Sequence, residues 1–265
     1  MIETKNALDV KMWRVTAASE RGSSHEKLNQ PCQDANAWHE TIAGFLVVAV
    51  ADGAGSAPMS ERGASIAVKT AVDSVCSGLV ALNPADETQQ LQQIMRKAAS
   101  SARQAITAEA SSQGIDVRDL ASTLIVVALT PTATAAIQIG DGAAVAFDVD
   151  GGVWGLTTPQ NGEYANETTF LISAGALETA QVSVHQKAAD AISVFSDGLQ
   201  MLALDMSEGT PYEPYEPFFK PLFRFIKETP NESDANKQLA QFLNSARVRD
   251  RADDDLTLLL ATRVG

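Results

Sequence analysis

Apolar residues recur along the first half of the chain with the period of strands and then with that of helices. Residues 11–19, 35–39 and 44–51 are short β-rich runs, and the last is apolar enough for a central strand. From Ser60 the apolar positions fall at helical spacing as far as Leu79. Residues 86–112 are polar and rich in alanine, which predicts a second, more exposed helix.

The second half of the chain begins with short strand-like runs and continues with helical patterns. The predicted strands are residues 123–129, 133–139, 143–148, 153–156, 168–173, 182–186 and 191–195. A helix is expected to start after Asp197, two more are predicted at 218–228 and 233–247, and residues 256–262 form the last strand. An acidic, proline-rich loop at 205–217 precedes the last two helices.

This order of elements predicts an α+β fold. Consecutive short strands favour antiparallel sheets over βαβ units, so we expect two antiparallel sheets packed together with a pair of helices outside each. The 265 residues, 45% of them hydrophobic, are enough for one large core, and no change in composition marks a linker. We therefore predict a single domain over residues 1–265.

The charge of the chain argues against some classes of partner. It has 33 acidic and 20 basic residues, a net charge of −13, so neither nucleic-acid binding nor a basic membrane-binding patch is expected. The sequence holds no run of 18 or more apolar residues, and its first residues lack a signal-peptide pattern, so no membrane insertion is expected. Two cysteines without metal-ligand spacing fit a reducing compartment, which predicts a cytoplasmic location.

Aspartates stand at the ends of several predicted strands. They are Asp34 before residues 35–39, the Asp-Gly pairs that begin at Asp52, Asp141 and Asp197, and the three aspartates 253–255 before the last strand. Carboxylates at strand ends can converge on one edge of a sandwich, where they would suit hard divalent cations such as Mg²⁺ and Mn²⁺. The glycines of residues 53–55 also look like the start of a phosphate-binding loop, but the carboxylate of Asp52 would repel a bare phosphate, which favours a metal.

The Asp-Gly dipeptide has a second interpretation. It is a common hairpin turn, and Asp141-Gly142 lies directly between two strand-like runs, so a hairpin is predicted there. Helical patterns follow Asp52-Gly53 and Asp197-Gly198 instead. These two aspartates are therefore the stronger candidates for a metal site.

A set of short motifs occurs in a fixed order along the chain: Gln33-Asp34, Asp52-Gly53-Ala54-Gly55, Ser122-Thr123, Gly140-Asp141-Gly142, Ser196-Asp197-Gly198 and Asp254-Asp255-Leu256-Thr257. The set resembles the metal-dependent PP2C-type protein phosphatases, and the stretch from His25 to Asp34 is similar to the bacterial branch of that family. The resemblance covers about residues 10–263. It implies an αββα sandwich with two Mg²⁺ or Mn²⁺ ions between the sheets, and hydrolysis of phosphoserine and phosphothreonine by a water that the ions activate.

The resemblance also assigns roles to individual residues. Asp52 would bridge both metals, and the carbonyl of Gly53 would bind one of them. Asp197 and Asp254 would hold the other, and Asp34 would act through coordinated waters.

Three further assignments rest on looser matches. Some bacterial members bind a third metal through an aspartate just before the Ser-Thr pair, for which Asp119 is the candidate. The arginine that grips the substrate phosphate in many members is missing from residues 28–30, so Arg21 or His25 would replace it. The histidine that follows the first Asp-Gly in many eukaryotic members is Ala54 here, so His25 or water would protonate the leaving group. A hydrogen-bonded loop histidine without a catalytic role is the alternative for His25.

These departures leave a non-enzymatic alternative open, a catalytically silent PP2C-like domain that binds phosphoproteins or regulatory partners. The retained Asp52, Asp197 and Asp254 argue against it, since their mutual repulsion would destabilise the fold without cations. The predicted function is therefore that of a metal-dependent protein serine/threonine phosphatase. We expect a monomer that acts on a phosphorylated protein and opposes a serine/threonine kinase.

Overall fold

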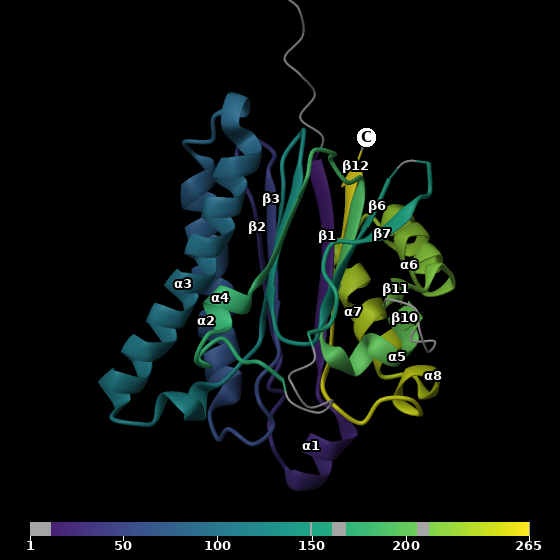
Figure 1. Cartoon of the computed structure of the whole chain (residues 1–265). Helices are drawn as coiled ribbons and strands as arrows, with labels where there is room; N and C mark the ends of the chain where they lie inside the picture. The colour runs from purple at the N-terminus through teal and green to yellow at the C-terminus, as the bar shows by residue number, and fades with distance from the viewer. Residues whose placement is uncertain (1–11, 149, 161–167, 206–211, 265) are drawn as a thin grey trace, which may run out of the picture.

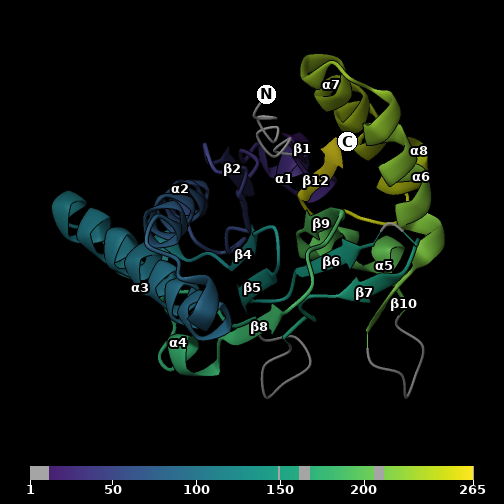
Figure 2. The ribbon, with the colours of Figure 1, turned by 90° about the horizontal axis from the view of Figure 1, so that it is seen from above.

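Two five-stranded antiparallel sheets pack face to face between two layers of helices (Figure 1). The structure is a computed structural model that describes residues 12–148, 150–160, 168–205 and 212–264. Seen from above, one helix pair lies outside one sheet and a second group of helices lies outside the other (Figure 2). The predicted α+β sandwich is confirmed.

The first sheet has the strand order β2-β3-β4-β5-β8. Its strands are β2 (Ala35–Glu40), β3 (Leu46–Ala51), β4 (Leu124–Leu129), β5 (Thr134–Ile139) and β8 (Gln181–His185). Helices α2 (Ser60–Leu79) and α3 (Glu87–Gln113) cover its outer face. Both helices bury a stripe of small and aliphatic side chains against each other and the sheet.

The second sheet has the strand order β1-β12-β9-β6-β7. Its strands are β1 (Met12–Glu20), β12 (Leu256–Val264), β9 (Ala191–Phe195), β6 (Ala143–Phe147) and β7 (Val153–Gly155). Helices α6 (Glu216–Glu228) and α7 (Glu232–Leu243) cover its outer face. Phenylalanines of α6 pack there against Phe147 and Phe195.

The sequence of strand β3 is apolar at every position. Successive side chains point to opposite faces of a strand. Val47 and Ala49 pack in the core beneath α2 and α3, whereas Val48 and Val50 pack in the core between the two sheets. Because both faces of β3 are buried, its sequence does not alternate between apolar and polar residues.

Shorter elements complete the fold. They are the helices α1 (Ser23–Leu28), α4 (Ala176–Thr179), α5 (Gln200–Ala203) and α8 (Ala246–Arg249), the 3₁₀ turns η1 (Pro84–Asp86), η2 (Val117–Leu120) and η3 (Asp197–Leu199), and a two-stranded ribbon of β10 (Leu204–Asp205) and β11 (Glu213–Pro214). Six residues of the predicted acidic loop, 206–211, lie outside the described residues.

One predicted strand and the end of one predicted helix are wrong. Residues 168–170 are irregular and residues 171–173 form a turn, not a strand. Leu171 is buried there, and its backbone N–H donates a hydrogen bond to the carbonyl of Ser122. The helix predicted at 233–247 ends at Leu243, and α8 starts after Ser245. The Asn244 side chain bonds back to the carbonyl of Ala240 at this break, a local bond that competes with helix continuation.

Membrane-spanning potential among the described helices is confined to one bent pair. Within the described residues, each helix taken alone is too short or too polar for a membrane span; α2 and residues 84–113 together have the length and composition of one, with a bend of 117° between them.

Candidate metal centre

The aspartates at the strand ends lie together at one end of the seam between the two sheets. Strand β3 ends there before Asp52 and β9 ends there before Ser196-Asp197, while β2 and β12 begin there after Asp34 and Asp255. Carboxylate oxygens of Asp52, Asp141 and Asp197 lie within 4.8 Å of one another. The convergence of strand-end aspartates predicted from the sequence is confirmed.

The prediction of a hairpin at Asp141-Gly142 is wrong. Strand β5 before this pair belongs to one sheet, and β6 after it belongs to the other, where its partners are β7 and β9. The pair therefore crosses the seam between the sheets, and Gly140, with φ of +113°, redirects the chain there. Asp141 joins Asp52 and Asp197, a site residue that the local turn signal concealed.

Burial and mutual repulsion raise the pKa values of the clustered carboxyl groups. Burial raises the pKa of Asp34 to about 6, with repulsion from Asp255 adding to it. Burial, and then repulsion from Asp141, Asp254 and Asp34, raise the pKa of Asp197 to about 7. The pKa of Asp52 is raised well above its ordinary value, first by burial and then by the charges of Asp34, Asp197 and Asp254. Asp52 and Asp197 thus each interact with several carboxyl groups of the cluster.

Two buried carboxylate oxygens of the cluster have no hydrogen-bond partner in the described structure. Asp34 accepts a hydrogen bond at Oδ2 from the Ser196 hydroxyl, 2.7 Å away, but its Oδ1 is unpaired. Asp141 accepts one at Oδ2 from the Thr168 hydroxyl, 2.5 Å away, and its Oδ1 is also unpaired. Buried carboxylates without partners are costly unless a cation binds them. The donor set, all hard oxygen, therefore fits Mg²⁺ or Mn²⁺.

Two glycines allow the loops of the site to pack closely. A Cβ on Gly53 would lie 2.7 Å from the carbonyl oxygen of Gln33, and one on Gly198 would lie 2.2 Å from that of Asp255. Both distances are too short for a side chain. Glycine follows Asp52 and Asp197 because only glycine lets neighbouring backbones approach so closely.

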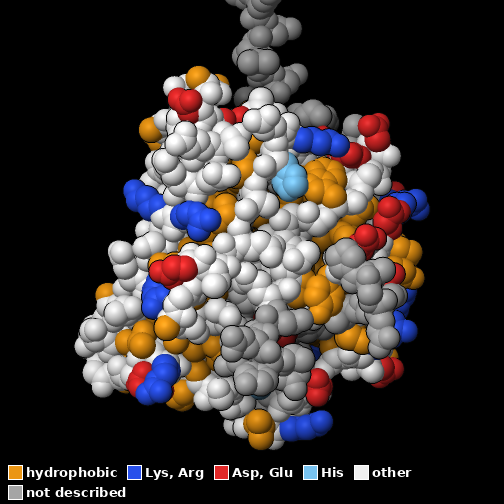
Figure 3. All heavy atoms as spheres, viewed as in Figure 1, with side chains coloured by type: hydrophobic (Ala, Val, Ile, Leu, Met, Phe, Trp, Pro, Cys, Tyr) orange, Lys and Arg blue, Asp and Glu red, His pale blue; other side chains and the backbone are white. Residues whose placement is uncertain are grey.

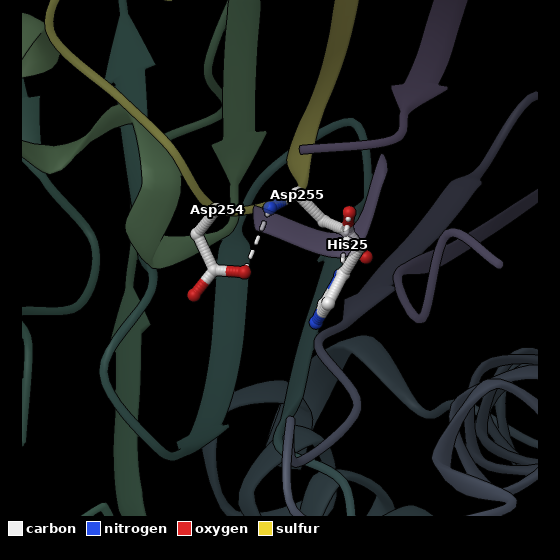
Figure 4. A group of neighbouring side chains, drawn as sticks. All are labelled: His25, Asp254 and Asp255. Carbon is white, nitrogen blue, oxygen red and sulfur yellow. Dashed lines mark hydrogen bonds and ion pairs between the residues drawn. The ribbon is translucent and has the colours of Figure 1, made fainter. Parts of the chain in front are cut away.

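His25 and Asp255 form a buried pair beside the cluster (Figure 4). The Nδ1 of His25 lies 2.9 Å from Oδ1 of Asp255, although the pair does not have the geometry of a hydrogen bond. The neighbouring Asp254 is exposed, and its Oδ1 accepts a hydrogen bond from the backbone N–H of Asp255. Ligand atoms of His25, Asp254 and Asp255 also lie within 4.8 Å of one another.

Asp255 is a second site residue that sequence reasoning missed. Its carboxylate accepts hydrogen bonds from the backbone N–H groups of Gly22, at 2.6 Å, and Gln33, at 2.5 Å. The run of three aspartates before β12 marked the region without distinguishing its members. Of the three aspartates only Asp255 directly precedes the buried strand β12, and this adjacency is the sequence signal that could have singled it out. In the structure Asp253 and Asp254 are exposed.

Two other predicted residues lie outside the acidic cluster. Asp119 lies in η2, and its carboxylate belongs to neither group of potential ligand atoms among the described residues, so its role at a third metal stays a prediction. Arg21 is exposed and donates a hydrogen bond to the carbonyl of Gln30, 3.2 Å away. Its role in gripping phosphate likewise stays a prediction.

Comparison with known proteins identifies the family. The sequence model of a family described as Protein phosphatase 2C matches residues 21–244. Serine/threonine-protein phosphatase 3 of Escherichia coli (strain K12) is 37% identical over 259 residues, which cover 94% of this chain and 98% of that protein.

Solved structures share the fold at lower identity. The serine/threonine phosphatase of S. agalactiae has a TM-score of 0.62 and 16% identity, and the match covers 95% of this chain and 100% of that one. PppA of Pseudomonas aeruginosa, described as a key regulatory component of T6SS, has a TM-score of 0.59 and 18% identity over 96% of this chain and 98% of that one. With its αββα sandwich and its acidic cluster at the seam of the sheets, the chain belongs to the protein phosphatase 2C family.

Proposed function

We propose that this chain hydrolyses phosphoserine and phosphothreonine side chains of proteins with two divalent cations, Mn²⁺ or Mg²⁺, held by the acidic cluster. Family membership makes the chain a protein phosphatase, and the family is metal-dependent. The main support for the proposal is the convergence of Asp52, Asp141 and Asp197, whose oxygens lie within 4.8 Å of one another. Buried carboxylates at such distances repel one another unless cations lie between them.

The residues that would hold the cations follow from the contacts of the cluster. Asp52 interacts with Asp34, Asp197 and Asp254, which supports a bridging position between two ions, with the Gly53 carbonyl as a further ligand. Asp197, Asp254 and Asp141 would complete one side, and Asp34 would orient waters from the other. When bound, such a pair of cations supplies an activated water for in-line attack on phosphorus and neutralises the phosphoryl oxygens. A third, weaker ion at Asp119 remains part of the proposal.

His25 is proposed to donate the proton that the leaving alkoxide needs. Its Nδ1 edge is held beside Asp255, which leaves Nε2 for other partners. A Cβ on Gly55 would lie 3.8 Å from that Nε2, so this edge of the ring is directed at the loop that follows Asp52. A buried histidine in contact with a carboxylate, next to the reacting groups, suits general acid catalysis.

The proposed substrate is a phosphorylated protein, and the enzyme would oppose a serine/threonine kinase in the cytoplasm as a monomer. Nucleic acid is not proposed as a partner. On the face in Figure 3, the basic side chains of the described residues are scattered among acidic ones rather than gathered in a stripe. That pattern and the net charge of −13 suit a protein substrate better than a polyanion.

Hydrolysis of a phosphothreonine peptide tests the proposal. We expect turnover with Mn²⁺, none with a chelator, and loss of turnover in Asp52→Asn, while Asp73→Asn, an exposed carboxylate on α2, keeps the wild-type rate. Mn²⁺ should also raise the melting temperature of the wild type, because it binds only the folded state. A melting temperature that responds to Mn²⁺ without any turnover would favour the catalytically silent alternative. Turnover that persists in chelator would contradict the metal mechanism.

A further inference from the structure

An apolar groove separate from the acidic cluster is lined by residues on or beside α5, α6, α7 and α8. Figure 1 shows these helices on the outer side of the second sheet. Tyr215, Phe218, Leu222 and Phe242 contribute its apolar lining. Tyr215 is 49% exposed, so part of this lining is open to solvent. The volume of the groove is about 130 Å³, close to that of the engineered cavities of about 150 Å³ that bind benzene. The groove therefore has room for one aromatic ring.

Two arginines give this groove a charge opposite to that of the rest of the molecule. Arg247 and Arg251 line it, and both are exposed. Among the described residues neither side chain forms an ion pair or a hydrogen bond, although the chain as a whole has a net charge of −13. Unpaired guanidinium groups beside an apolar surface favour a carboxylate on the partner.

The groove is a short distance from the metal site along two segments of chain. Arg251 precedes Asp254 by three residues, and Leu202 on the groove wall follows Asp197 by five. Consecutive Cα atoms are about 3.8 Å apart, so the Cα atoms of Arg251 and Asp254 are at most about 11 Å apart. An extended peptide advances about 3.3 Å per residue. A peptide with its phosphorylated residue at the cluster would thus reach the groove about three to five residues away.

We propose that this groove is a specificity subsite that binds an aromatic side chain of the phosphoprotein substrate, next to an acidic residue, three to five residues from the phosphorylated one. The aromatic ring fills the space between Tyr215 and Phe242, and the carboxylate pairs with Arg247 and Arg251. This inference rests on the proposed function, because it names the substrate sequence that the same phosphatase site prefers.

Two measurements test the subsite. The first is kcat/KM for phosphothreonine peptides that carry a Glu-Phe pair three to five residues to either side, against the same peptides with Ala-Ala. For the best placement we expect the Glu-Phe peptide to be preferred about tenfold or more. The second is fluorescence anisotropy with a labelled Glu-Phe peptide that has no phosphate, which reports binding without turnover. The variants are Arg247→Gln/Arg251→Gln and Tyr215→Ser, with Arg96→Gln/Lys97→Gln on the exposed face of α3 as the matched loss of two charges.

We expect the two groove variants to bring the ratio of kcat/KM for the Glu-Phe peptide to kcat/KM for the Ala-Ala peptide towards one, mainly by raising KM for the Glu-Phe peptide. We also expect them to weaken binding of the unphosphorylated peptide. The α3 variant should keep both. Equal kcat/KM for the two peptides in the wild type, or a preference that survives both groove variants, would overturn the subsite. Failure of the proposed function would look different, since no phosphopeptide or aryl phosphate would then be hydrolysed with Mn²⁺; loss of anisotropy in the groove variants would in that case still support the groove as a binding site.

Discussion

Nδ1 of His25 lies 2.9 Å from Oδ1 of Asp255, and both side chains are buried at the edge of the metal site. The same carboxylate accepts hydrogen bonds from the backbone N–H groups of Gly22 and Gln33. These two residues flank the segment that contains α1, so one carboxylate holds both ends of the segment as well as its histidine. The positions of His25 and of the adjacent Asp34 therefore depend on Asp255.

We expect Asp255→Asn to destabilise the protein and to impair catalysis together. The asparagine side chain has no charge beside His25. Its NH₂ group would also face one of the two backbone N–H groups that donate to the carboxylate in the wild type, so that N–H would lose its acceptor. Leaving a buried donor unpaired costs about 1–3 kcal/mol. Chemical denaturation measures the loss of stability. The control is Asp253→Asn, an exposed carboxylate in the same run of aspartates, which should unfold like the wild type. Equal stability of the two variants would contradict the clamping role of Asp255.

His25→Gln should impair hydrolysis most where the leaving group is poor. A general acid contributes about 10²–10⁴-fold when the departing oxygen needs a proton. We expect a loss in this range for a phosphothreonine peptide and a much smaller loss for an aryl phosphate, whose leaving group departs as a stable phenolate. His39→Gln, on the exposed part of β2, is the matched control. Equal losses for both substrates would assign His25 a structural or phosphate-binding role instead.

Asp141→Asn should weaken metal binding without unfolding the protein. Its carboxylate has one buried oxygen without a partner and lies with those of Asp52 and Asp197. We expect the Mn²⁺ concentration for half-maximal activity to rise about tenfold or more, since removing a side chain that supports a metal site typically lowers metal affinity by about 10–100-fold. Asp150→Asn, an exposed carboxylate in the turn before β7, should leave that concentration unchanged. An unchanged Mn²⁺ requirement in Asp141→Asn would remove Asp141 from the site.

The general position of the site could be predicted because antiparallel strands that end and begin at one edge bring their flanking residues together. Asp52 follows the end of β3 and Asp34 precedes the start of its antiparallel neighbour β2, so strand direction places these two at one end of their sheet. Asp197 follows β9 of the other sheet, and its place beside them depends in addition on how the two sheets pack. The sequence pattern also revealed the two helix pairs, because their apolar positions recur at helical spacing.

The two missed residues needed information that is not local. Asp141-Gly142 has the sequence of a hairpin turn, but β5 and β6 belong to different sheets and do not pair with each other, so the turn joins two sheets. Asp255 differs from Asp253 and Asp254 only in its burial, which depends on the packing of residues 22–33 against the start of β12. In both cases the tertiary pairing overrides the local signal.

Gly198→Ala should displace the loop that carries Asp197. A Cβ at this position would lie 2.2 Å from the carbonyl oxygen of Asp255, so one of the two loops must move. Overpacking of this kind costs about 1–3 kcal/mol, and we expect weaker Mn²⁺ binding in addition, which calorimetry would measure. Gly155→Ala is the matched control, since its Cβ would meet its nearest neighbour at an ordinary 3.6 Å. Wild-type metal affinity and stability in Gly198→Ala would show that the loops are not held by this contact.

The metal-free protein should lose stability as pH rises from about 4 to about 7. The pKa of Asp34 is raised to about 6 and that of Asp197 to about 7, above the value near 3.9 in an unfolded chain. The folded state therefore holds more protons across this window, and stability present at low pH is lost as the carboxyls ionise. Because Mn²⁺ binds the ionised carboxylates, its stabilising effect should grow over the same window.

Melting temperatures between pH 4.5 and 7.5, with chelator and with Mn²⁺, measure both trends. Asp197→Asn removes one of the titrating groups, so its metal-free melting temperature should fall less steeply with pH. A metal-free melting temperature that rises towards pH 7 would mean that the cluster is not a source of repulsion.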